Sequence, residues 1–170
     1  MTTVRCSIFR VVRLVLIGLS CGLGWIAAGG CSSVGNAGAP TYAWAPPDFA
    51  LQAAVYPDAA TPRDRPHLRS AQHVVEADGT FRAAVGPGIH AGMLPPVTAR
   101  LDPSELDRLW RLAAPLMPLQ SAEAAAAESP GAGLVELGIT AGGQTQRGFA
   151  NARRAEPLLR RLARLRGDRP

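Results

Sequence analysis

The chain has 170 residues, enough for one domain and too short for two cores of ordinary size. Hydrophobic residues make up 47% of it but aromatic residues only 5%, so the core must consist mainly of leucine, valine and alanine. Three of the 18 basic residues and none of the 13 acidic residues precede position 31, which leaves 15 basic residues against 13 acidic ones. This near balance argues against a nucleic-acid-binding domain.

The first thirty residues have the layout of an export signal. Three arginines precede an apolar stretch at 14–26, and four small residues at 27–30 precede Cys31. The apolar stretch is shorter than the about 20 residues that span a bilayer. Cleavage before Cys31 would also remove Cys6 and Cys21, leaving no second thiol for a disulfide or a metal site. An uncleaved inner-membrane anchor remains an alternative.

Residues 28–31, Ala-Gly-Gly-Cys, resemble the lipobox of bacterial lipoproteins, with Ala28 where that family usually has leucine. The resemblance implies that residues 1–30 are a signal peptide and that Cys31 receives a diacylglyceryl group. Because Ser32 rather than aspartate follows the cysteine, it also implies an outer-membrane location facing the periplasm. Retention in the inner membrane remains open, as does secretion after cleavage near residues 37–39. Cys21 is a poorer lipidation site because apolar residues would remain on the mature chain.

Residues 31–47 are rich in serine, glycine, alanine and proline, a composition typical of a flexible tether. We expect a single globular domain over residues 48–168. Its first strand lies within 48–56, where every second residue is apolar. Two more strands, at 68–77 and 80–86, are joined by a two-residue turn at Asp78-Gly79. That register places Val74 on the apolar face and His73 on the polar face. A proline-bounded loop follows at 86–96.

The clearest helix start is at Leu101-Asp102-Pro103-Ser104-Glu105. Asp102 is a suitable N-cap, Pro103 suits the first helical position, and Glu105 is placed to complete a capping box. The helix should bury Trp110 and end at Pro115. Residues 121–131 are alanine-rich and lack an apolar stripe, so we expect a mobile connection or a short frayed helix there.

A second hairpin is predicted after residue 134, with a three-residue turn at 141–143 that places Val135 opposite Phe149. The last element is a helix that begins between Ala152 and Pro157 and buries a leucine stripe. Strands, helix, hairpin and helix in this order indicate an α+β fold. We expect two layers, an antiparallel sheet of hairpins with two helices packed on one face.

The residues indicate no catalytic, cofactor or metal site. His67 and His73 would lie about 20 Å apart on one extended strand, too far to share a metal. Ser70 is expected on a strand and Ser104 in a helix, and the loop residues Ser121 and Ser129 have no histidine near them in sequence. Glu76 and Asp78 suit a turn rather than acid–base catalysis. We therefore expect a protein that is not an enzyme.

The last helix carries a possible basic surface. Such a basic amphipathic helix can lie on anionic lipid or bind an acidic partner, and the alternative is a solvated outer face. Its candidate residues are Arg153, Arg154, Arg160, Arg161 and Arg164.

The capped Leu-Asp-Pro-Ser-Glu helix, the hairpin and the leucine-rich terminal helix together resemble the small emfourin-type protease-inhibitor domains over residues 72–166. The resemblance implies an α+β fold and no particular site residue. Two functions are therefore expected. The first is a lipid-anchored envelope protein that contacts the membrane through its N-terminal lipid and another envelope component through its domain. The second is an inhibitor of a secreted peptidase that acts through the loop at 86–96.

Overall fold

The computed structural model describes residues 42–59 and 64–167. The signal peptide, Cys31 and the first part of the tether predicted above lie outside these residues. The elements in chain order are β1 (Ala50–Tyr56), the 3-10 turn η1 (Pro66–Leu68), β2 (Ala71–Val75), β3 (Thr80–Val85), β4 (Val97–Arg100), α1 (Pro103–Ala113), the 3-10 turn η2 (Ala114–Leu116), α2 (Ala122–Glu128), β5 (Leu134–Ala141), β6 (Gln144–Asn151) and α3 (Ala152–Arg166).

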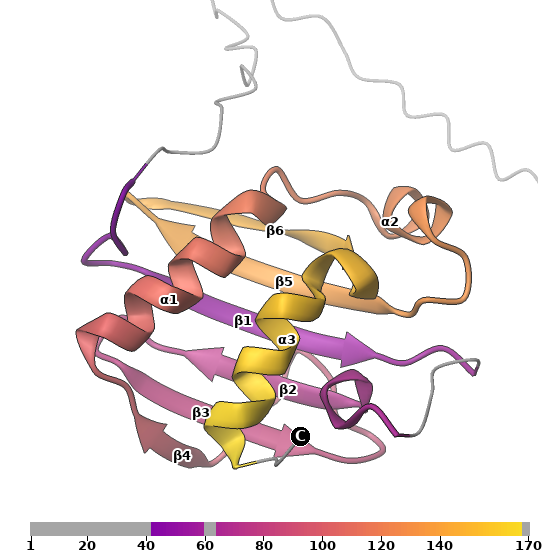
Figure 1. Cartoon of the computed structure of the whole chain (residues 1–170), viewed down its shortest axis with the longest axis horizontal. Helices are drawn as coiled ribbons and strands as arrows, with labels where there is room; N and C mark the ends of the chain where they lie inside the picture. The colour runs from indigo at the N-terminus through magenta and orange to yellow at the C-terminus, as the bar shows by residue number, and fades with distance from the viewer. Residues whose placement is uncertain (1–41, 60–63, 168–170) are drawn as a thin grey trace, which may run out of the picture. The chain divides into compact units, whose positions relative to one another are not determined.

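The strands described form one six-stranded antiparallel sheet in the order β4-β3-β2-β1-β5-β6. Helices α1 and α3 lie across one face of it (Figure 1), whereas the short α2 lies near β6. The arrangement is a two-layer α+β fold, so the predicted fold class is confirmed.

The core lies between the helices and the sheet. Alternate residues of β5 point into it, and Val135, Leu137 and Ile139 are almost fully buried. The indole of Trp110 meets the ring of Phe49 edge-on, with 5.5 Å between the centroids. The predicted strand alternation and the predicted role of Trp110 as an anchor are both confirmed.

The first hairpin has a three-residue loop at 77–79, so the predicted two-residue turn is wrong. The Glu76 N–H donates to Thr80 O, the Gly79 N–H donates to Glu76 O, and Gly79 has a φ of +84°. A turn followed by a glycine in the left-handed region is the usual three-residue hairpin loop. The extra loop residue moves every pairing by one position. Consequently His73 faces the core, where it is 1% exposed, and Val74 lies on the outer face.

The loop of the second hairpin is shorter than predicted, whereas that of the first is longer. Ala141 pairs with Gln144, which leaves a two-residue turn of Gly142 and Gly143 with φ values of 60° and 75°. Two consecutive left-handed residues form the turn that matches strand twist best. The predicted three-residue turn is therefore wrong, and Val135 lies opposite Ala150 rather than Phe149.

Helix α1 begins as predicted. The Asp102 carboxylate accepts from the Glu105 N–H at 2.9 Å, and Pro103 occupies the first turn. The Glu105 side chain does not complete a capping box, because it bonds to Arg108 and Arg161 instead.

Two elements differ from the expectations in their extent. Strand β4 pairs with β3 at the edge of the sheet, where no strand was predicted. The segment 121–131 contains α2, with Ser121 as its N-cap and Ala125 fully buried. Because the buried residue of this helix is an alanine, the sequence shows no stripe of larger apolar residues there.

Residues 42–47, at the end of the expected tether, contact α1. The Trp110 indole donates to the Tyr42 carbonyl at 3.0 Å, and the Ala45 N–H donates to the Asp107 carboxylate at 2.8 Å. The chain therefore enters the domain along the layer that α1 and α3 form, called the helical layer below.

Candidate functional site

The C-terminal helix α3 owes its amphipathic character to the spacing of its leucines. The Asn151 side chain caps its start by accepting from the Arg153 N–H at 2.9 Å, and Gly167 ends it in the left-handed region. Leu158, Leu159 and Leu162 are buried on one side. The arginines between them are therefore on the outer side.

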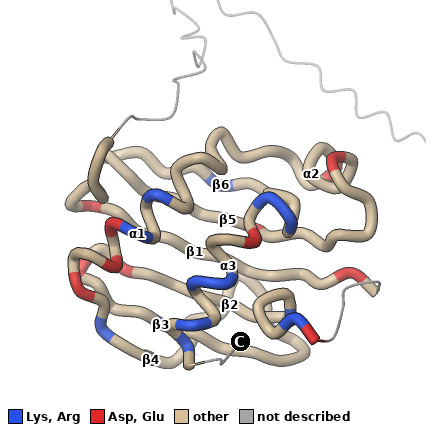
Figure 2. The backbone as a smooth tube through the Cα atoms, in the orientation of Figure 1, with Lys and Arg blue, Asp and Glu red and all other residues tan. Residues whose placement is uncertain are grey.

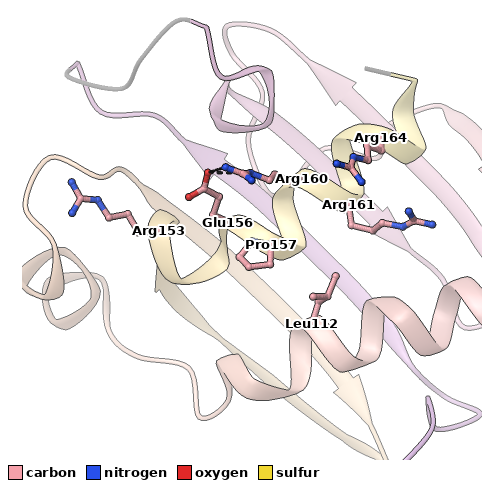
Figure 3. Close-up of a pocket in the computed structure, with 7 residues that line it drawn as sticks. All are labelled: Leu112, Arg153, Glu156, Pro157, Arg160, Arg161 and Arg164. Atoms are coloured by element: carbon pink, nitrogen blue, oxygen red, sulfur yellow. Dashed lines mark hydrogen bonds and ion pairs between the residues drawn. The ribbon is translucent and has the colours of Figure 1, made fainter. Parts of the chain in front are cut away.

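These arginines border a groove of about 450 Å³ between α1 and α3 (Figure 3). Leu112 of α1 points toward α3, and Pro157 lies between the arginines of α3. The groove combines apolar contacts with guanidinium groups. Its lining residues are Leu112, Arg153, Glu156, Pro157, Arg160, Arg161 and Arg164.

Four of the five predicted basic residues thus share one groove, and Arg154 does not. The Arg154 guanidinium donates to the Pro115 carbonyl at 3.0 Å and lies 3.9 Å from Glu128. On a helix its side chain is turned about 100° from that of Arg153, so adjacent arginines face different surroundings. The predicted basic surface is therefore narrower than the sequence suggested.

Glu156 is the acidic residue of the groove, and several cations surround it. Its Oε1 lies 2.6 Å from Arg160, 3.2 Å from His67 and 3.6 Å from Arg65. Burial raises the pKa of Glu156, but hydrogen bonds from Arg160 and His67 outweigh it and hold that pKa below its usual value. Glu156 therefore stays ionised at neutral pH and neutralises only part of the local positive charge.

Glu105 compensates a second part of this charge. Its carboxylate accepts from Arg161 across the helical layer, and its other oxygen lies 3.3 Å from Arg108 on the same helix. Arg153 and Arg164 are both exposed and have no carboxylate partner among the described residues. Among the groove residues, these two guanidiniums carry the charge that no carboxylate compensates.

Charge is unevenly distributed over the domain. Arginines far outnumber acidic residues on α3, α1 carries residues of both signs, and further acidic residues lie in the loops at the sheet ends and in α2 (Figure 2). This explains how a chain of nearly balanced charge presents a positive face.

The histidines lie in three different environments. His67 contacts Glu156, His73 stacks on Phe81 with its Nε2 3.1 Å from Arg166, and the His90 ring accepts from the Gly92 N–H within the loop at 86–96. Within residues 42–59 and 64–167, no three histidine, cysteine or acidic side chains are grouped as a metal site would require.

The loop at 86–96 is held against the outer face of the sheet. The amides of Gln52 and Gln72 both donate to the Ala91 carbonyl, and the bond from Gln72 measures 2.9 Å. Beyond this attachment, Leu94 is 72% exposed and Met93 40% exposed. The loop therefore presents apolar side chains from a fixed base.

Comparison of the sequence with family models and with curated proteins gave no match. No helix in the described part of the chain is long and apolar enough to cross a bilayer.

Sequence analysis identified the arginines of α3 but not their neighbours in the groove. The Glu156–Arg160 pair has the i, i+4 spacing that a helical wheel can find. Leu112, His67 and Glu105 come from distant parts of the chain, and no local pattern links them to α3.

Proposed function

We propose that this chain is a lipid-anchored protein of the bacterial cell envelope, without catalytic activity, whose domain binds an acidic component at the α1–α3 groove. The observation that carries the binding role is the pair Arg153 and Arg164, which are exposed at one groove and have no carboxylate partner in the described residues. Arginine pairs well with carboxylates and phosphates because its guanidinium can form two parallel hydrogen bonds.

The lipobox-like residues 28–31 support the anchoring role. Acylation at Cys31 would hold the domain at a bilayer, with outer-membrane placement favoured by Ser32. The positive groove then serves as a contact site for a neighbouring envelope component of opposite charge.

The anchoring role is tested with the full chain expressed in a two-membrane bacterium. We expect the wild-type protein to sediment with membranes and to carry an acylated residue 31 by mass spectrometry. Cys31→Ser should lose both properties, because the acyl chains have no other attachment point. Cys21→Ser is the matched control and should retain both.

If the Cys31→Ser protein still sediments fully and keeps its leader, the lipid anchor is refuted and the uncleaved membrane anchor is supported. If the Cys21→Ser variant loses its acylation, the lipid is attached at Cys21 instead.

A second candidate function is inhibition of a secreted peptidase, and the exposed Leu94 on its fixed loop favours it. A pre-organised apolar loop loses little entropy when it enters a cleft. We would measure inhibition of a neutral metallopeptidase by the detergent-solubilised full chain. Inhibition that Leu94→Asp removes and Val74→Asp preserves would support this function, and no inhibition at micromolar concentration would end it.

A further inference from the structure

The helical layer of the domain presents a row of arginines on its outer side. Arg153, Arg160 and Arg164 are exposed on α3, and Arg108 and Arg111 are exposed on α1. With a rise of about 1.5 Å per residue, the row on α3 extends over about 16 Å. A charged row of this length suits an extended anionic surface better than a single small anion.

Local acidic residues neutralise this row only in part. Glu105 and Glu156 each contact at least two cations, and Asp102, the N-cap of α1, also attracts Arg108. Asp107 accepts from the Ala45 backbone. An approaching surface would therefore meet a net positive field.

Aromatic side chains occur where the chain enters this layer. Trp44 is 65% exposed and Tyr42 46% exposed, and the Arg111 guanidinium lies 5.6 Å from the centre of the Trp44 ring. Exposed tryptophan and tyrosine next to arginine are typical of protein surfaces at the membrane–water interface.

The length of chain before this entry point limits how far the domain can lie from its anchor. Ten residues lie between Cys31 and Tyr42, and the eleven steps along the chain span at most about 36–40 Å when fully extended. A tethered domain therefore meets its own bilayer at high effective concentration.

On these grounds, and resting on the proposed acyl anchor, we infer that the helical layer docks through its α1 and α3 arginines on acidic phospholipid headgroups of the bilayer that holds the anchor. The domain then lies with α1 and α3 toward the membrane and its sheet directed away. Guanidinium–phosphate pairing supplies the attraction, and the loop at 86–96 stays accessible to other molecules.

The test uses the acylated full chain reconstituted in two kinds of vesicle, one of phosphatidylcholine alone and one of equal parts phosphatidylcholine and phosphatidylglycerol. Both contain a lipid with a spin label on its headgroup, which quenches nearby tryptophan fluorescence. The third tryptophan, Trp25, lies in the leader that cleavage before Cys31 removes. Trp44 is the reporter because Trp110 is only 1% exposed, and Trp44→Phe assigns the signal. We expect stronger quenching in the acidic vesicles, and the excess should disappear at about 1 M salt.

The decisive variant is Arg153→Gln with Arg164→Gln, which removes two arginines without carboxylate partners and spares the core. Each arginine near an acidic surface contributes about fivefold to binding, so the ratio of docked to undocked protein should fall about 25-fold. Arg100→Gln with Arg147→Gln is the matched control, since both residues are exposed on sheet strands. It should dock like the wild-type protein.

Equal quenching in the two vesicles, or equal losses in the two double variants, would overturn the docking proposal. So would arginine-dependent binding of a polyglutamate peptide in neutral detergent micelles without any excess quenching in acidic vesicles, since that result would indicate an acidic protein partner. Flotation with phosphatidylcholine vesicles reports the acyl anchor separately. A chain that floats but does not dock therefore refutes only this inference.

Discussion

Glu105 of α1 and Arg161 of α3 form an ion pair across the helical layer, although 56 residues separate them in the chain. Glu105 is 9% exposed, and the Arg161 side chain is 27% exposed. The pair is thus partly shielded from water and joins the two helices that border the groove.

Replacing Glu105 by Gln should lower the free energy of unfolding by about 2 kcal/mol, because Arg161 loses a charged hydrogen-bond partner. Arg108→Gln removes a much more exposed pair to the same carboxylate and should cost less than about 0.5 kcal/mol. Urea unfolding followed by circular dichroism measures both values. Equal costs would mean that the contact between the helices contributes no more than the exposed pair.

Gly79 should be more sensitive to an added side chain than Gly88. Its φ is +84°, and a Cβ there would lie 2.6 Å from the Leu101 carbonyl oxygen. The two residues are held close together because the Leu101 N–H donates to the Gly79 carbonyl at 2.8 Å. Gly88 has a similar φ of +81° with open space around it. Gly88→Ala should therefore cost only about 1–2 kcal/mol of backbone strain.

Gly79→Ala should cost about 1–3 kcal/mol more than Gly88→Ala, because backbone atoms must also move apart. Chemical denaturation of the two variants gives this difference directly. The same cost in both would show that the close approach of residues 79 and 101 does not matter to stability.

Asp48 should make stability depend on pH in the acid range. Its carboxylate accepts from the Gly143 and Gly142 N–H groups at 2.6 and 2.9 Å, and these bonds hold its pKa below the ordinary 3.8. A lowered folded-state pKa stabilises the fold above the unfolded value and loses that contribution as the pH falls through the folded value. Wild type should therefore be more stable than Asp48→Asn near neutral pH.

Thermal unfolding over a pH series tests this prediction. The melting temperatures of wild type and Asp48→Asn should converge as the pH falls below about 4. A difference that stays constant down to about pH 2 would contradict the assigned role of the carboxylate.

Gln72 should control the mobility of the loop at 86–96. Its buried amide donates to the Ala91 carbonyl, and in Gln72→Ala only the hydrogen bond from the half-buried Gln52 would remain at that carbonyl. We expect amide hydrogen exchange within 88–94 to accelerate and stability to fall by about 1 kcal/mol. Gln144→Ala, at the exposed start of β6, should change neither quantity. Unchanged exchange in the Gln72 variant would show that the loop is held by other contacts.

Some features were accessible to sequence analysis because their causes are local. The Asp102 cap, the Asn151 cap and the alternation in β1 and β5 each depend on residues within a few positions of one another. Local geometry also sufficed for the two-layer α+β class, since amphipathic strands and helices must bury their apolar faces against each other.

The two hairpin registers could not be obtained in this way. Asp78-Gly79 and Gly142-Gly143 are each compatible with loops of two or three residues, so the choice depends on which pairing packs better. At the first hairpin, the three-residue loop places Val75 opposite Phe81 in the core, at the cost of burying His73. At the second, the Asp48 carboxylate binds both turn glycines from 94 residues away.

The sequence by itself therefore determined the export-signal pattern, the caps, the fold class and the presence of arginines on the last helix. The tertiary structure decided which of those arginines face one groove, which carboxylates compensate them, and that residues 42–47 lie on α1. The physical reason is range. Capping and amphipathic periodicity act over about one helical turn, whereas compensation of charge across a groove depends on side chains that only folding brings together.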